Sequence, residues 1–350
     1  MLKSIITLLA LASSFAHAAP TTITTFDGQS LHADLMMPTT APKAAVLIIQ
    51  GSGNVDLDGE VTSPMLGSPL PGQSGKLSLQ IAESLAKAGI ATLRFSKRGV
   101  DNSAQLENQT VPFILKDAKS AMNTLMTKLP GLKYGVIGFS EGGLIATMLA
   151  DDIKLDGLYL MAPPTRSIDS ILGYQFYNWP TKHLLGHLHA MNTETIDASV
   201  LSTNQALNIP LLALPLPALD ANHDGKLSVT DEILMAYQNF YFQVRGLLAT
   251  PQYAGWYQSL KVLPEFTHFA ANTKADHVFI YQGLKDAQMN SSWVMEDAFA
   301  FPVKPTLHLY QGLGHCFSPM TGEYGEVKTT GPLSPSMLEQ LALDASTLLN

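Results

Sequence analysis

Ser140 lies among glycines in a segment that could present it as a nucleophile, reading Gly138-Phe139-Ser140-Glu141-Gly142-Gly143. A short apolar run at 134–137 precedes it, and apolar residues recur at helical spacing over 144–149. A chain that turns this sharply from strand to helix strains the serine backbone, and glycines permit the close approach around it. We therefore predict a nucleophile elbow. The alternative is a glycine-rich turn with an incidental serine.

A serine nucleophile needs a base for its proton and an acid that orients the base. In a parallel sheet, reactive groups gather beyond the carboxyl ends of the strands. Of the ten histidines, His315 alone follows the last predicted strand at that end, and Asp286 follows the strand at 277–282 in the same way. We predict a triad of Ser140, Asp286 and His315. Asp169, after the strand that ends at Met161, is an alternative acid.

Acyl transfer at a serine also requires N–H donors for the oxyanion. One is predicted at Glu141, directly after the nucleophile, and another in the glycine-containing loop at 50–54, from Ser52 or Gly53. The alternative for this loop is an ordinary tight turn between a strand and a helix.

The elements that would position these groups alternate between strand and helix. Two strands around the turn Asp27-Gly28 predict an antiparallel hairpin within 23–37. Further strands are predicted at 44–50, 90–95, 134–137, 155–161, 277–282 and 306–310, and helices at 77–88, 111–129, 289–299 and 335–349. This order predicts an α/β fold with a mostly parallel, doubly wound sheet.

The alternation stops between residues 166 and 272, where helical segments rich in aromatic residues and broken by prolines take over. We interpret 166–272 as a mainly helical cap insertion, called the cap below, between core segments 19–165 and 273–350. The aromatic stretch from Tyr237 to Trp256 is predicted to form the cap's own core, with a part of it lining an acyl pocket as the alternative.

Three segments carry a resemblance to a known family: Gly51-Ser52-Gly53-Asn54-Val55-Asp56, Arg94-Phe95-Ser96-Lys97-Arg98-Gly99-Val100 and Gly138 to Gly143. They resemble bacterial α/β-hydrolase-fold serine esterases with a GSG-type oxyanion loop. The family typically has aspartate where this chain has Ser96 and glycine where it has Asp101. The order Ser, Asp, His along the chain is also that of the α/β-hydrolases. The resemblance covers both core segments but not the cap, and it implies carboxylic ester hydrolysis without a cofactor.

The cap contains a segment, 220–231, that matches an EF-hand loop. Oxygen-bearing side chains stand at loop positions 1, 3, 5 and 9, glycine stands at position 6, and position 7 would bind through its carbonyl. Position 12 is Asp231 rather than the usual glutamate, which should weaken calcium binding or favour magnesium. We predict a structural Ca²⁺, with Mg²⁺ as the alternative, held by residues Asp220, Asn222, Asp224, Lys226, Ser228 and Asp231. A metal-free turn that caps a helix is the other interpretation.

The chain begins with one positive charge, an apolar run over 5–15 and Ala16-His17-Ala18. This pattern is typical of a secretory signal peptide, 1–18, with cleavage after Ala18. The apolar run is too short for a stable membrane span. We expect a periplasmic or secreted protein. A net charge of −8 without a basic run argues against nucleic-acid binding.

Two further groups are weaker candidates for chemistry. His183, His187 and His189 have metal-like spacing but no accompanying carboxylates, and Cys316, the only cysteine, is not presented by an elbow. The sequence thus predicts an exported serine hydrolase that acts on small-molecule carboxylic esters. A peptidase or an acyltransferase could use the same triad, and a non-catalytic, calcium-ordered binding protein is the alternative outside enzymes.

Overall fold

The computed structural model describes residues 17–62, 75–100, 109–197, 219–320 and 332–349. Eight strands form one sheet in the order β1-β2-β4-β3-β5-β6-β9-β10. β1 pairs antiparallel with β2, and β2 with β4, whereas all other neighbours are parallel. The expected mostly parallel α/β fold is confirmed.

The strands of the sheet are β1 (His17–Thr24), β2 (Ser30–Met37), β3 (Ala44–Ile49), β4 (Ile90–Phe95), β5 (Lys133–Phe139), β6 (Leu155–Met161), β9 (Ala275–Gly283) and β10 (Thr306–Tyr310). The helices outside the cap are α1 (Leu77–Lys87), α2 (Val111–Lys128), α3 (Glu141–Asp152), α10 (Ser291–Asp297), η5 (Ala298–Ala300), α11 (Pro335–Ala345) and η6 (Ser346–Leu349).

The hairpin at the antiparallel edge turns at Asp27-Gly28, as expected, with Gly28 at a φ of 79°. Its first strand is longer than predicted because it begins at His17, which lies opposite Met37. Most of the predicted signal peptide falls on residues 1–16, outside the described part of the chain. Its last two residues, 17 and 18, are paired in β1.

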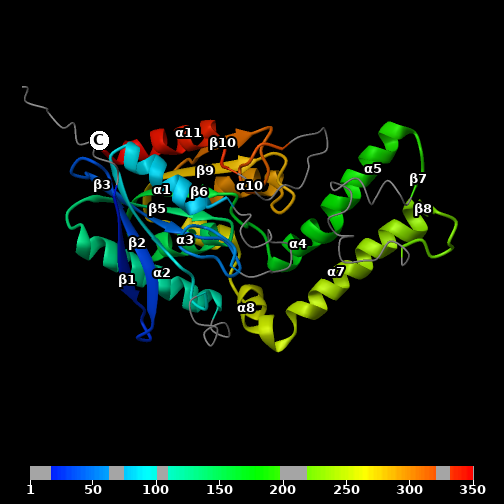
Figure 1. Ribbon diagram of the computed structural model, residues 1–350, viewed down its shortest axis with the longest axis horizontal. Helices are drawn as coiled ribbons and strands as arrows, with labels where there is room; N and C mark the ends of the chain where they lie inside the picture. Colours follow the sequence, from blue (N-terminus) through cyan, green and yellow to red (C-terminus); the bar gives the residue numbers. More distant parts are fainter. Residues whose placement is uncertain (1–16, 63–74, 101–108, 198–218, 321–331, 350) are drawn as a thin grey trace, which may run out of the picture.

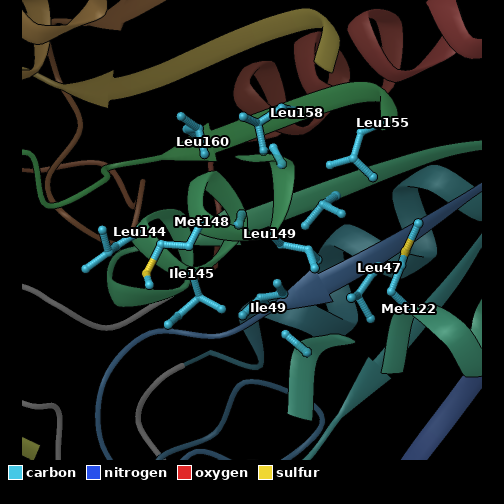
Figure 2. Packing of buried hydrophobic residues seen from close by; sticks show 14 of the residues in the cluster. Leu47, Ile49, Met122, Leu144, Ile145, Met148, Leu149, Leu155, Leu158 and Leu160 are labelled. Carbon is cyan, nitrogen blue, oxygen red and sulfur yellow. The ribbon is translucent and has the colours of Figure 1, made fainter. Parts of the chain in front are cut away.

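Helices cover both faces of the sheet (Figure 1). One buried cluster joins one sheet face to α2 and α3, and a second joins the other face to α1 and α11. Figure 2 shows the first cluster, where Leu47 and Ile49 of β3 lie close to Ile145 and Leu149 of α3. Burial of each such side chain contributes about 1.5–3 kcal/mol. This packing fixes α3, and therefore the residue before it, against the sheet.

The cap lies between β6 and β9. Its elements are α4 (Ile168–Gly173), η2 (Tyr174–Asn178), α5 (Trp179–Met191), β7 (Thr195–Asp197), β8 (Lys226–Ser228), η4 (Val229–Ile233), α7 (Leu234–Leu248), α8 (Pro251–Lys261) and α9 (Phe266–Ala271). Helices α5 and α7 extend together away from the sheet, with β7 and β8 near their far ends (Figure 1).

Two small clusters hold the cap together. The outer cluster includes Leu184, Leu227 and Tyr237, and the inner one includes Phe176 and Phe240. Helix α9, the last helix of the cap range, packs against the core, because its phenylalanines join the cluster on α3. In the part of the chain that the structure describes, no helix has the length and apolar character needed to cross a membrane.

Candidate active site

Ser140 is the single residue between β5 and α3. Its φ of 51° is rare for a residue with a side chain and costs about 1–3 kcal/mol. Its N–H donates to the Met161 carbonyl over 2.9 Å. A Cβ on Gly138 would lie 2.2 Å from the Gly142 oxygen, and one on Gly142 would lie 2.2 Å from the Ile49 oxygen. The two glycines are therefore required for this turn, and the geometry is that of a nucleophile elbow.

His315 and Asp286 contact each other directly. His315 Nδ1 lies 2.9 Å from Asp286 Oδ2, and both side chains are buried. The other carboxylate oxygen accepts from the N–H groups of Gln288 at 2.7 Å and Met289 at 2.8 Å, while Gln282 Nε2 donates to Oδ2 over 2.9 Å. A carboxylate at this position requires Nδ1 to carry hydrogen, which makes Nε2 the ring nitrogen that can act as a base.

The loops that carry these two residues are joined to each other. One loop follows β9 and the other follows β10, and these two strands are neighbours in the sheet. The Leu284 N–H donates to the Tyr310 carbonyl over 2.9 Å, and the Lys285 N–H donates to the Leu313 carbonyl over 3.1 Å. Gly283 packs so closely that a Cβ there would lie 2.4 Å from the Leu313 oxygen. This contact fixes the position of the histidine loop relative to the acid.

Ser140 and His315 line the same cavity, of about 210 Å³, at the carboxyl ends of the parallel strands. The ring of Phe139, next to the serine, lies 5.1 Å from the imidazole ring of His315. Apolar side chains of the cap form much of the remaining wall, among them Ile171, Leu172, Phe176, Val244, Leu248 and Trp256. A cavity with a mostly apolar lining, above a serine and a histidine, can bind an acyl group next to a nucleophile.

Residues 65–318 match the model of the alpha/beta hydrolase fold family. The protein belongs to this family. The resemblance found in the sequence motifs is thereby confirmed at the level of the fold family.

Among curated proteins, this α/β hydrolase is similar to esterase EstD from Thermotoga maritima, with 28% identity over 134 residues. The match covers 38% of this chain and 30% of EstD, so the chain spans about a third of that relative's length. Similarity to an esterase supports a hydrolase, but over only part of that protein.

Solved structures of esterases share the fold. Est1E from Butyrivibrio proteoclasticus superposes with a TM-score of 0.51 at 15% identity and covers 94% of this chain and 98% of its own. The Pyrococcus furiosus esterase PF2001 superposes with a TM-score of 0.50 at 14% identity, with coverage of 95% and 90%.

The predicted oxyanion loop of this α/β hydrolase packs directly on the elbow. A Cβ on Gly51 would lie 3.3 Å from side-chain atoms of both Phe139 and Ser140. Of the two candidate donors in the loop, Ser52 lines the cavity, while Gly53 adopts a φ of 94°. Glu141, the other predicted donor, is the first residue of α3 and also lines the cavity.

Asp169, the alternative acid, and Cys316, the other candidate for chemistry, lie in environments that differ from that of the triad residues. Asp169 accepts from the Tyr257 hydroxyl and forms ion pairs with Arg245 and Lys261 inside the cap. Cys316 lines the cavity, but its burial raises the pKa of the thiol to about 12, which opposes nucleophilic chemistry. Asp286 is thus the carboxylate that the structure brings to His315.

The aromatic stretch of the cap is divided between two environments. Tyr237 and Phe240 are buried in the cap's clusters, as predicted, whereas Tyr253 and Trp256 line the cavity. Both interpretations of this stretch therefore apply, each to a different part of it.

The EF-hand-like loop is closed by hydrogen bonds. Asp220 accepts from the N–H groups of Asp224 and Gly225, at 3.1 and 2.9 Å, and Asn222 accepts from Asp224 N–H at 3.0 Å. Gly225 has the left-handed φ of 76° expected at loop position 6. Among the described residues, no group of three or more His, Cys, Asp or Glu side chains is arranged to hold a metal ion.

The far end of this loop differs from the expected pattern. Asp231 is exposed, and the buried Glu232 accepts from the N–H groups of Ala221 at 3.0 Å and Ser228 at 2.8 Å. A π-helical turn at Val229–Ile233 carries one more residue per turn, which brings the residue after position 12 to the loop. Sequence reasoning missed Glu232, although a carboxylate beside position 12 was visible.

Two side-chain contacts of Glu141 at the site were not predicted. Lys97 binds the carboxylate of Glu141, with 2.6 Å between Nζ and Oε2, and the indole N–H of Trp256 donates to the other oxygen of that carboxylate. The signal for Lys97 was its place just after an apolar strand. No local pattern pairs Trp256 with a residue more than a hundred positions earlier.

Proposed function

We propose that this α/β hydrolase is a serine esterase that cleaves carboxylic esters through an acyl-enzyme. The observation that carries the proposal is the 2.9 Å contact between His315 Nδ1 and Asp286 Oδ2 at the cavity that Ser140 also lines. Similarity to esterase EstD over part of the chain supports ester hydrolysis over other reactions of the fold.

In this mechanism, Ser140 Oγ attacks the ester carbonyl as His315 Nε2 takes its proton. Asp286 holds the ring orientation and stabilises the imidazolium. The carbonyl π electrons move to oxygen, and the N–H groups of Glu141 and Ser52 bind that oxyanion. Collapse of the tetrahedral intermediate breaks the bond to the alcohol, which leaves with the proton from His315. Water, deprotonated by the same histidine, then releases the acid.

The size and the mostly apolar lining of the cavity favour substrates with an apolar acyl group. An apolar cavity of about 150 Å³ holds benzene, so about 210 Å³ accommodates roughly eight non-hydrogen atoms. We therefore expect medium-length acyl chains to be preferred over acetyl. A panel of p-nitrophenyl esters tests this expectation, and a preference for acetate would contradict it. Leu248→Ala, which removes a side chain from the wall, should shift the preference toward longer chains.

The triad is tested with Ser140→Ala and a fluorophosphonate probe, which labels only an activated serine. The variant should fold, lose ester turnover and remain unlabelled. Ser167→Ala is the matched control, because Ser167 lines the same cavity but caps α4 instead of occupying the elbow. Full activity of Ser140→Ala would end the proposal. A wild-type protein without any labelling would favour a binding protein, and faster turnover of amides or transfer to added alcohols would favour a peptidase or an acyltransferase.

We also propose a structural cation in the loop at 220–231, supported by its ligand types and by the left-handed glycine at position 6. The cation would brace the outer cap and take no part in the chemistry. Calorimetry with calcium and with magnesium tests this proposal. Absence of heat, together with an unchanged melting temperature in chelator, would end it.

We further propose export, on the charge and apolar pattern of residues 1–18. N-terminal sequencing of protein recovered from the periplasm and the medium tests both the export and the cleavage site. Cleavage after Ala18 would shorten β1 by two residues. An uncleaved chain retained inside the cell would contradict the proposal.

A further inference from the structure

Lys97 is a buried lysine next to the candidate active site, two residues beyond the end of β4. Only 5% of the surface of Lys97 is exposed to solvent. Its Nζ lies 2.6 Å from Glu141 Oε2 and 3.0 Å from the carbonyl oxygen of Gly51. Gly51 and Glu141 line the cavity, whereas Lys97 does not appear among its described lining residues. Lys97 therefore contacts the walls of the site from behind.

Both partners of Lys97 belong to the segments with the proposed oxyanion donors. The Gly51 carbonyl and the Ser52 N–H are parts of one peptide unit, and in a trans peptide these two groups point in opposite directions. No cis peptide bond occurs in the described chain. A donor that holds the Gly51 oxygen from behind thus directs the Ser52 N–H to the opposite side.

Glu141, the second partner of Lys97, connects this lysine to the elbow and to the cap. Glu141 supplies the other proposed N–H, and its carboxylate is held by Lys97 on one oxygen and by Trp256 of α8 on the other. Lys97 also donates its own backbone N–H over 3.3 Å to the carbonyl of Val55, the residue directly after the oxyanion loop at 50–54. One side chain thus joins the oxyanion loop to the first residue of α3.

We propose that Lys97 is a positioning residue for the oxyanion hole, acting by holding the Gly51 carbonyl so that the Ser52 N–H is oriented before the substrate binds. The inference rests on the proposed function, because it assigns a role in stabilising the tetrahedral intermediate. Preorganised donors are effective because they need not reorient when the charge develops. Lys97 itself contacts neither the substrate nor the reacting atoms.

The test separates this role from charge compensation of Glu141. In a Glu141→Gln background, where no buried carboxylate requires a cation, Lys97→Gln is compared with Lys97→Met. Both replacements are neutral and similar in length, but only glutamine can donate to the Gly51 oxygen. The readouts are kcat and KM for a p-nitrophenyl ester, and inhibition by a trifluoromethyl ketone. Ser140 adds to this ketone, whose carbonyl oxygen becomes an oxyanion as the serine proton moves to His315.

We expect the methionine variant to lose about 10²-fold in kcat relative to Glu141→Gln alone, the size of effect of one lost oxyanion donor. KM should change less than threefold. The trifluoromethyl ketone should bind more weakly by the same factor as kcat/KM, while the corresponding methyl ketone binds unchanged. The glutamine variant should recover at least a tenth of the Glu141→Gln activity.

Equal activity of the methionine and glutamine variants would overturn the inference, as would a parallel loss of methyl ketone binding, which indicates a collapsed cavity. If the methionine variant does not fold, Lys97→Leu in the same background replaces it, with the same outcomes. A wild-type protein that neither turns over esters nor reacts with fluorophosphonate would refute the proposed function instead. These failures are therefore distinguishable.

Discussion

The indole N–H of Trp256 donates to the carboxylate of Glu141, the residue that follows Ser140. Trp256 lies on α8 of the cap and also lines the cavity. This contact makes the cap part of the site, because the residue next to the candidate nucleophile is held by the segment that forms the cavity's apolar wall. The position of the cap and the geometry of the elbow are thus joined through one carboxylate.

Replacement of Trp256 by phenylalanine should weaken this junction. Phenylalanine keeps most of the apolar surface but cannot donate, and a hydrogen bond to a charged acceptor contributes about 1.5–3 kcal/mol. We expect a fall in the free energy of unfolding of up to that size and a severalfold higher KM for esters, measured by denaturant titration and steady-state kinetics. Trp179→Phe is the control. Trp179 and His183 both lie on α5, where their rings stack on each other, and neither belongs to the junction between α8 and Glu141. Equal effects of both changes would argue against the junction.

Asp286→Asn should lower kcat by about 10³- to 10⁴-fold, because an amide can stabilise the wrong histidine tautomer and cannot compensate the imidazolium charge. The measurement is ester turnover at neutral pH. Asp169→Asn is the matched control, since that carboxylate pairs with Tyr257, Arg245 and Lys261 rather than with His315. It should retain turnover and lower the stability of the cap. The reverse result would assign the acid to Asp169.

Gly142→Ala should destabilise the elbow. Its Cβ would lie 2.2 Å from the Ile49 carbonyl oxygen, so backbone must move, at a cost of about 1–3 kcal/mol or more. Gly246→Ala in α7 is the comparison, because a Cβ there meets no atom within 4 Å. That change should instead add about 0.5–1 kcal/mol of helix stability. Denaturant titration of both variants measures the difference, and similar effects would mean that the elbow is looser than described.

The Cys316 thiol should resist iodoacetamide at pH 8 in the native protein and react after denaturation, because burial raises its pKa to about 12. The unfolded thiol, with a usual pKa near 9, ionises first as the pH rises. Its contribution to stability is therefore present below about pH 9 and is lost between about pH 9 and 12. Cys316→Ala should remove that part of the pH dependence. Rapid alkylation of the folded protein would contradict the burial.

Local patterns were sufficient for most of the fold. Apolar periodicity and turn residues predicted α1 to within one residue of its observed end, and placed Ser140 at the corner between β5 and α3. The first strand was predicted too short because His17 to Pro20 show no alternation, and their pairing with β2 decides the structure there. The helix predicted at 335–349 ends at Ala345 and continues as a 3-10 turn.

The sequence predicted the candidate site only through the positions of residues at the ends of strands. The sequence by itself determined that Ser140, Asp286 and His315 each follow a strand, because strand and turn signals are local. Only the tertiary structure decided that His315 meets Asp286 and not Asp169, since the order β6-β9-β10 places the last two loops side by side. The contacts of Glu141 with Lys97 and Trp256 were decided in the same way, because they depend on how the sheet and the cap pack together and not on any spacing along the chain.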